Sequence, residues 1–143
     1  MKSYILLIIF LMAACTSRQG NDAVVRDKAA IIRTELDFAK MTAEKGIAEA
    51  FYTFADTGAV INRSGMLIRG RDLIRDYYEL HFQTGTILEW TPDFVDVSGD
   101  IGYTYGKYTH ATPDSTGQLI KSHGIFHTVW KRQSDGSWLF VWD

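Results

Sequence analysis

The spacing of the apolar residues changes near residue 85, so the two halves of the chain predict different structures. Before that point apolar residues recur every three or four positions, which is typical of helices that bury one face. The first helix is predicted from about Ala23 to Lys45, with Asp22 placed to cap it and Gly46 to end it. Its predicted apolar face consists of Val25, Ala29, Ile32, Leu36, Ala39 and Ala43.

Two shorter helices are predicted after Gly46, one at Ile47–Phe54 and one between Gly70 and Phe82. The first is followed by the turn-like "ADTG". Between the two helices, "AVIN" and "MLI" flank "RSG", which predicts a hairpin of two short strands.

Beyond residue 85 the apolar period is two, which is typical of half-buried strands. The strand-like segments are "TILEWTP", "DFVDVS", "IGYTYGKYTH", "LIKSHGIFHTVWKR" and "SWLFVWD". Asp135 and Gly136 mark a hairpin turn between the last two segments. Helices followed by antiparallel strands predict an α+β domain, in which N-terminal helices pack on a curved, mainly antiparallel sheet.

The N-terminus has the pattern of an export signal rather than of the folded domain. Lys2 precedes an apolar run from Tyr4 to Ala14 that is short for a membrane span. The following "LMAAC" resembles the lipobox of bacterial lipoproteins, which are cut before the cysteine and acylated on it. We therefore predict a signal peptide at residues 1–14, lipidated Cys15 and a tether at 15–22, and the domain at 23–143. An ordinary signal peptide, cut near the two alanines, is the alternative.

The composition and net charge of the chain limit which partners and cross-links are expected for this domain. The 143 residues carry a formal net charge of −2 without a stripe of Lys or Arg, so nucleic acid is not an expected partner. Cys15 is the only cysteine, so the mature domain forms no internal disulfide. Aromatic residues make up 13% of the chain, which favours an aromatic sheet and a lined cavity.

Three segments carry a resemblance to a known superfamily: "EKGIAEAFYTFADTGAVI", "LEWTPDFVDVSGDIGYTYGKY" and "GIFHTVWKRQSDGSWLFVWD". With the order of elements, they resemble the ketosteroid isomerase and nuclear transport factor 2-like proteins, which include the SnoaL-like polyketide cyclases. The resemblance covers roughly Val24 to Asp143 and is greatest to an exported bacterial branch of unknown function. It implies a conical fold with a ligand cavity between the helices and the sheet.

The resemblance also locates the catalytic positions of the isomerase, which uses an aspartate base, a tyrosine and a protonated aspartate. It places Asn62 at the base and Phe38 at the tyrosine. The second acid falls at 126–128, where no carboxylate stands. An amide does not accept a proton from carbon at neutral pH. The sequence therefore assigns no catalytic set, and Asp143 is the one carboxylate expected near the pocket mouth.

Other ligand and partner predictions follow from the strand pattern. His123 and His127 lie about 13 Å apart if they share a strand face, too far for one metal ion, so no metal is expected. The glycines of "GYTYG" lie within a strand pattern and do not form a phosphate cradle, and no other cofactor is expected. Large apolar residues on both faces of the late strands predict a homodimer through the outer sheet face. The residues predicted to reach the pocket are Tyr52, Asn62, Tyr78, Trp90, Tyr105, His123 and Asp143.

Three functions remain open from the sequence. The protein is an envelope lipoprotein that binds a small, mostly hydrophobic molecule, or an isomerase, dehydratase or cyclase that uses a relocated acid such as Asp143. The third alternative is a structural or interaction protein whose pocket is filled by its own side chains. An open cavity of about 300 Å³ or more with a buried carboxylate supports the enzyme, an open cavity without one supports the binder, and the absence of a cavity supports the third alternative.

Overall fold

The computed structural model describes the backbone of residues 2–143 and the side chains of residues 20–143. Its helices are α1 (Lys2–Lys45), α2 (Ile47–Phe54) and α3 (Arg71–His81). Its strands are β1 (Ala55–Arg63), β2 (Met66–Arg69), β3 (Ile87–Ser98), β4 (Ile101–Pro113), β5 (Leu119–Arg132) and β6 (Trp138–Trp142). Cys15 and the predicted signal peptide lie outside the residues with described side chains. Within the described part of the chain, no helix is both long and apolar enough to cross a membrane.

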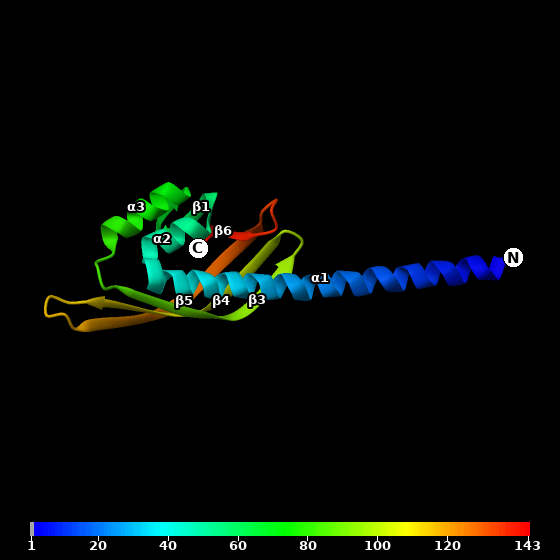
Figure 1. The fold of residues 1–143 in the computed structure, drawn as a ribbon, viewed down its shortest axis with the longest axis horizontal. Helices are drawn as coiled ribbons and strands as arrows, with labels where there is room; N and C mark the ends of the chain where they lie inside the picture. Colours follow the sequence, from blue (N-terminus) through cyan, green and yellow to red (C-terminus); the bar gives the residue numbers. More distant parts are fainter. Residues whose placement is uncertain (1) are drawn as a thin grey trace.

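The six strands form one curved, open sheet in the order β2-β1-β6-β5-β4-β3 (Figure 1). Neighbouring strands are antiparallel, except for the parallel pair β1 and β6. The predicted strands "TILEWTP" and "DFVDVS" form the single strand β3, which contains a register shift between Pro92 and Phe94. The predicted α+β class with a mainly antiparallel sheet is confirmed.

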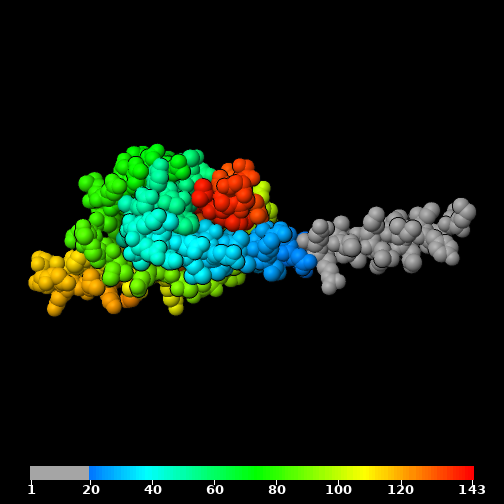
Figure 2. All heavy atoms as spheres, in the orientation of Figure 1, coloured from blue at the N-terminus to red at the C-terminus, as the bar shows by residue number. Residues whose placement is uncertain are grey.

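The core lies between the helices and the inner face of the sheet. Phe38 of α1 is its centre, with ring centroids 4.8 Å from Phe51, 4.8 Å from Trp90 and 5.8 Å from Phe140. These contacts join α1, α2, β3 and β6 in one aromatic cluster, and edge-to-face and stacked pairs of this kind stabilise the fold beyond the burial of their area. Figure 2 shows α2 and α3 (cyan to green) and β6 (red) together on one side of the molecule.

The predicted apolar face of α1 is wrong by one position. The residues that α1 buries are Ile31, Glu35, Phe38 and Thr42, whereas Leu36 is 48% exposed. Periodicity misplaces this face because two of its four members are polar, and both are satisfied inside the protein. The Thr42 hydroxyl, for example, contacts the backbone oxygens of Ala39 and Leu88 at 2.7 and 3.1 Å.

Two predicted boundaries also differ from the structure. Asp22 lies within α1 rather than at its N-terminal cap. The turn-like "ADTG" belongs to β1, which begins at Ala55. The turn-like composition of this segment corresponds to a local contact, in which the Asp56 carboxylate accepts a hydrogen bond from the Gly58 backbone N–H at 2.9 Å. The pairing of β1 with β6 also shifts register between Ala55 and Val60, so the segment is an irregular strand.

Candidate functional site

A cavity of about 530 Å³ lies between the helices and the sheet. All three helices and strands on both sides of it contribute residues, because the curved sheet and the helices diverge beyond the aromatic core. Its apolar walls are formed by Phe38, Phe51, Phe82, Leu88, Trp90 and Phe126. A volume of this size falls in the range of small-molecule sites, and mostly apolar walls with a few polar groups are typical of them.

The structure brings four of the seven predicted pocket residues together at this cavity. Asn62, Tyr78, Trp90 and Asp143 line it, from β1, α3, β3 and the end of the chain beyond β6. Tyr78 is almost completely buried, with 2% of its surface exposed. The β1–β6 pairing fixes Asp143, because the Asp143 N–H donates to the Val60 carbonyl at 3.1 Å.

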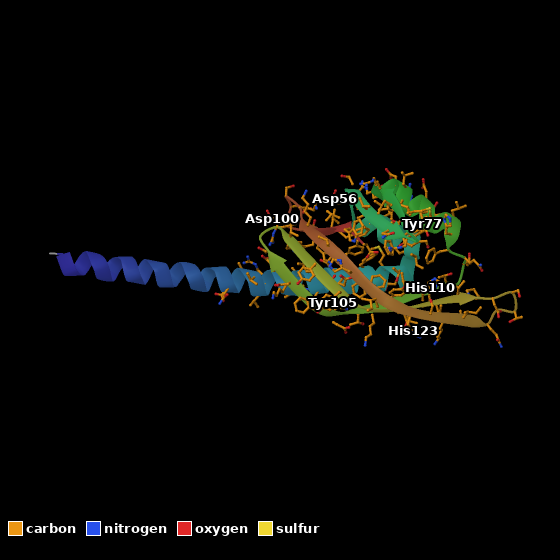
Figure 3. The ribbon with its side chains drawn as sticks, turned by 180° about the vertical axis from the view of Figure 1, so that it is seen from behind. Asp56, Tyr77, Asp100, Tyr105, His110 and His123 are labelled. Atoms are coloured by element: carbon orange, nitrogen blue, oxygen red, sulfur yellow. The ribbon has the colours of Figure 1, made fainter. Side chains whose placement is uncertain are left out.

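The other three predicted pocket residues lie elsewhere. Tyr52 stacks under the guanidinium groups of Arg71 and Arg75, 4.9 and 4.5 Å from its ring centroid. Tyr105 and His123 have odd positions on β4 and β5, whereas even positions of these strands face the helices. Figure 3 shows both residues on the sheet side away from the helices. Strand parity was visible in the sequence, but the concave face was not.

Arg63, which the sequence did not single out, organises the polar end of the cavity. Its Nε donates to the Tyr78 hydroxyl at 2.9 Å, and Nη2 donates to the same hydroxyl and to the Asp143 carboxylate. Its Nη1 donates to the backbone oxygens of Asn62 and Asp143 at 2.9 and 3.3 Å. These contacts occupy all five N–H donors that a guanidinium carries.

The Asp143 carboxylate is held by partners on both oxygens. Oδ1 accepts from Arg63, and Oδ2 accepts from the Thr128 hydroxyl at 3.0 Å. The Asp143 side chain is 12% exposed, and the Arg63 side chain is 27% exposed. The ion pair is therefore largely shielded from water, and its net charge is zero.

Strand parity explains why Arg63 rather than Asn62 enters this cluster. Ala59 and Ile61 of β1 are fully buried, so the odd positions of the strand face the interior. Arg63 continues that series and reaches Tyr78, whereas Asn62 is an exposed residue at the rim of the cavity. The amide at the position of the isomerase base therefore does not occupy the polar end of the cavity.

A second carboxylate, that of Glu35, lies beneath the cavity wall and is fully buried. It accepts hydrogen bonds from Trp90 Nε1 at 2.6 Å, from the Thr104 hydroxyl at 2.6 Å and from Trp130 Nε1 at 3.0 Å. Burial raises the pKa of Glu35 to about 7, against the lowering effect of these hydrogen bonds. Trp90 connects the two sites, because its ring lines the cavity while its N–H binds Glu35.

No family model matches the sequence, and no curated protein matches it. Solved structures do match. An NTF2-like protein with a cystatin-like fold from Novosphingobium aromaticivorans aligns with a TM-score of 0.70 and 19% identity, over 89% of this chain and 85% of that one. A ketosteroid isomerase-like protein from Erwinia carotovora atroseptica aligns with a TM-score of 0.67 and 16% identity, over 81% of this chain and 92% of that one. The association domain of CaMKII from C. elegans aligns with a TM-score of 0.65 and 19% identity, over 85% of this chain and 95% of that one.

The chain has the NTF2-like fold. The predicted resemblance to the nuclear transport factor 2-like and ketosteroid isomerase-like proteins is thereby confirmed at the level of the fold. Identities below 20% for these three structures carry no information about activity. The similarity to an exported bacterial branch stays a prediction.

Within this NTF2-like fold, the remaining two positions taken from the isomerase also lack the tyrosine and the carboxylic acid that the isomerase uses there. Phe38 is 1% exposed and packs in the aromatic core. At the position of the second acid, Phe126 lines the cavity and Thr128 binds Asp143. A Thr hydroxyl that donates to a carboxylate orients that carboxylate and does not replace an acid.

The four histidines of the NTF2-like domain are dispersed. His81 stacks on Tyr77 of the same helix with ring centroids 4.3 Å apart, and His110 lines the cavity beside Thr112. Among the residues with described side chains, no three His, Cys, Asp or Glu groups lie close enough to hold a metal ion.

Proposed function

We propose that this protein binds a small, mostly apolar molecule in the cavity between its helices and sheet, without catalysing a reaction on it. The observation that carries the proposal is the state of Asp143. Among residues 20–143 it is the one carboxylate that lines the cavity, and both of its oxygens have partners. The volume of about 530 Å³ argues against a pocket filled by the protein's own side chains.

A cavity with a largely buried carboxylate is the pattern expected of the enzyme, but the contacts of Asp143 support an enzyme that uses it less well than a binder. A general base needs a lone pair directed at the substrate proton and a pKa near the working pH. The carboxylate has about four lone-pair sites, so the contacts to Arg63 and Thr128 leave some of them free, but they hold Asp143 against the cavity wall. Glu35 has the raised pKa that such a base needs, but the cavity lining does not include it.

Identification of the bound molecule tests this proposal. We expect mass spectrometry of the protein purified from its own host to find an apolar small molecule at close to one per chain. Ser122→Trp should reduce this occupancy, because Ser122 is an exposed residue on the cavity lining. Lys121→Trp is the matched control, since its neighbouring position points to the other face of β5. Equal occupancy in the two variants would contradict the proposal.

We also propose that Cys15 anchors the protein in the bacterial cell envelope, facing away from the cytoplasm. The support is the sequence pattern of Lys2, the apolar run from Tyr4 to Ala14 and "LMAAC". Cys15→Ala should move the protein from the membrane to the soluble fraction of the cell. A variant that stays with the membrane would show that the lipid is not the anchor.

A homodimer through the outer sheet face is the third element of the proposal. Phe94, Tyr103 and Tyr105 form an exposed aromatic cluster there, with the rings of Phe94 and Tyr105 stacked at 5.1 Å. Such a surface favours association of chains. We expect chemical cross-linking of the full chain to give a dimer that Phe94→Lys removes. Leu80→Lys is the control, because Leu80 is 82% exposed on α3.

A further inference from the structure

We propose that the cavity selects an uncharged ligand that carries an oxygen acceptor, such as a ketone, ester or amide carbonyl. We assign the Tyr78 hydroxyl as the donor that binds this oxygen. The inference rests on the proposed function, because it names the chemistry of the molecule that the cavity holds. It follows from the inventory of donors and acceptors at the polar end of the cavity.

Arg63 does not have a donor left for a ligand. One N–H on Nε, two on Nη1 and two on Nη2 are matched by the contacts to Tyr78, Asn62 and Asp143. A ligand that took one of these donors would remove a hydrogen bond from a protein acceptor, and the loss is greatest for the largely buried Asp143 carboxylate. Arg63 is therefore a positioning residue, which holds Tyr78 and Asp143 in place.

The Tyr78 hydroxyl, in contrast to Arg63, has a donor left for a ligand. It accepts from Nε and Nη2 of Arg63, and among residues 20–143 no oxygen or nitrogen accepts its own proton. Burial raises the pKa of Tyr78, so the hydroxyl keeps that proton. Hydrogen bonds accepted from a cation polarise the O–H group and make it a stronger donor. A buried, unpartnered donor in a cavity wall favours a ligand with an acceptor.

The charge of the site selects against an anionic ligand. Arg63 and Asp143 form a neutral pair, so a ligand carboxylate would meet Asp143 without a free cation to compensate. Of the other polar residues of the lining, Asn62, Ser64, Ser122 and His127 are exposed, and Tyr108 and His110 are half-buried. They have water as an alternative partner and discriminate weakly. Tyr78 is the buried exception, which makes its hydroxyl the group that distinguishes ligands.

Two probes of the same shape test the assignment. The ketone 2-acetylnaphthalene offers a carbonyl oxygen, and 2-isopropylnaphthalene replaces it with a methyl group. Binding is measured by equilibrium dialysis on the full chain in phosphatidylcholine nanodiscs, with empty nanodiscs as the blank, because of the apolar run at the N-terminus. One buried hydrogen bond predicts that protein-bound ketone is favoured by about five- to ten-fold after correction for the lipid blank.

Tyr78→Phe should remove this preference and leave the affinity for the hydrocarbon unchanged. Tyr52→Phe, whose ring lies under Arg71 and Arg75 outside the cavity lining, should retain it. Failure of both probes to bind the wild type would overturn the proposed function itself. Binding of both probes with no preference, or a preference that survives in Tyr78→Phe, would overturn the assignment alone.

A second measurement keeps the test valid if Tyr78→Phe does not fold. The infrared carbonyl stretch of 2-acetylnaphthalene bound to the wild type should lie below its value in hexane and in empty nanodiscs, because a hydrogen bond weakens the C=O bond. A stretch at the hexane frequency would show that the carbonyl meets no donor and would overturn the assignment.

Discussion

Glu35 and Asp143 are two carboxylates on the inner side of the same sheet, and different groups stabilise them. Asp143 faces the cation of Arg63 and the hydroxyl of Thr128. Glu35 has three neutral donors, two indole N–H groups and one hydroxyl, and no cation among them. Both are hydrogen-bonded, yet only Asp143 has its charge cancelled.

The difference shows what each arrangement permits. A carboxylate beside an arginine keeps its charge at low cost and becomes a fixed part of the cavity wall. When only neutral dipoles hold a carboxylate, burial still makes its charged form unfavourable. The pKa of Glu35 is raised for this reason. The ion pair therefore forms the polar end of the proposed ligand site, and the dipole-held group is expected to make the stability of the fold depend on pH.

The largest effect is expected from Arg63→Met. This change leaves the largely buried carboxylate of Asp143 without its cation and removes the Arg63 hydrogen bonds of three other acceptors. We expect the free energy of unfolding to fall by about 3 kcal/mol in urea titrations. Arg33→Met, at an exposed position of α1, should change it by less than about 0.5 kcal/mol.

A second substitution, at Asp143, tests whether the charges of Arg63 and Asp143 interact. Asp143→Asn removes the orphaned charge, so the double variant Arg63→Met with Asp143→Asn should recover about 1 kcal/mol or more relative to Arg63→Met. A double variant that is as unstable as the sum of the two single variants would show that the charges do not interact.

Glu35 predicts a pH dependence of stability with a definite sign. Its pKa is raised from 4.5 to about 7 in the folded state, so the protonated group stabilises the fold below pH 4.5. That contribution is lost as the pH rises through about 7. Between pH 5 and pH 8 the free energy of unfolding should fall by ~2 kcal/mol from this group. Glu35→Gln should remove this slope, as urea titrations at both values would show; an unchanged slope would assign it to other groups.

Thr104→Val should have a smaller effect that itself depends on pH. The Thr104 hydroxyl lowers the pKa of Glu35 and stabilises its charged form, so its loss should cost about 1 kcal/mol more at pH 8 than at pH 5. Thr91→Val, an exposed residue of β3, is the control. A loss that is equal at both pH values would indicate that packing, rather than the carboxylate, is affected.

Asn62→Asp should have the smallest effect. Asn62 is exposed, so a charge there meets water, and stability should change by less than about 0.5 kcal/mol. We expect no steroid isomerase activity in the wild type or in this variant, because Phe38 supplies no hydroxyl and no second acid stands at 126–128. Turnover by the wild type would require another acid, and Asp143 is the first to test.

The sequence predicted the order of helices and strands well, because most elements have a clean period. It also predicted Tyr78 and Asp143 as pocket residues, and the structure places both at the cavity. It missed Glu35 because that residue occupies a polar position on the buried face of α1, and apolar periodicity passes over such positions. The partners that satisfy Glu35 lie 55 to 95 positions away.

Arg63 was missed for a related reason. It stands in "RSG", a segment with the composition of a solvent-exposed turn, and the resemblance drew attention to the preceding Asn62. The available signal was strand parity, since apolar Ala59 and Ile61 share a face with Arg63. Parity does not reveal that the face ends at Tyr78, because α3 and β6 are positioned by the tertiary fold.

The central claim is that Arg63 and Asp143 neutralise each other and leave a cavity for an uncharged ligand. The most direct test compares 2-acetylnaphthalene with 2-naphthoate, two probes of similar shape that differ in charge, in equilibrium dialysis on the full chain at pH 7.5. The account predicts that the protein binds the ketone at least ~10-fold more tightly than the carboxylate, after correction for the lipid blank. Equal or tighter binding of 2-naphthoate would show that the ion pair opens and that Arg63 serves the ligand, which contradicts the account.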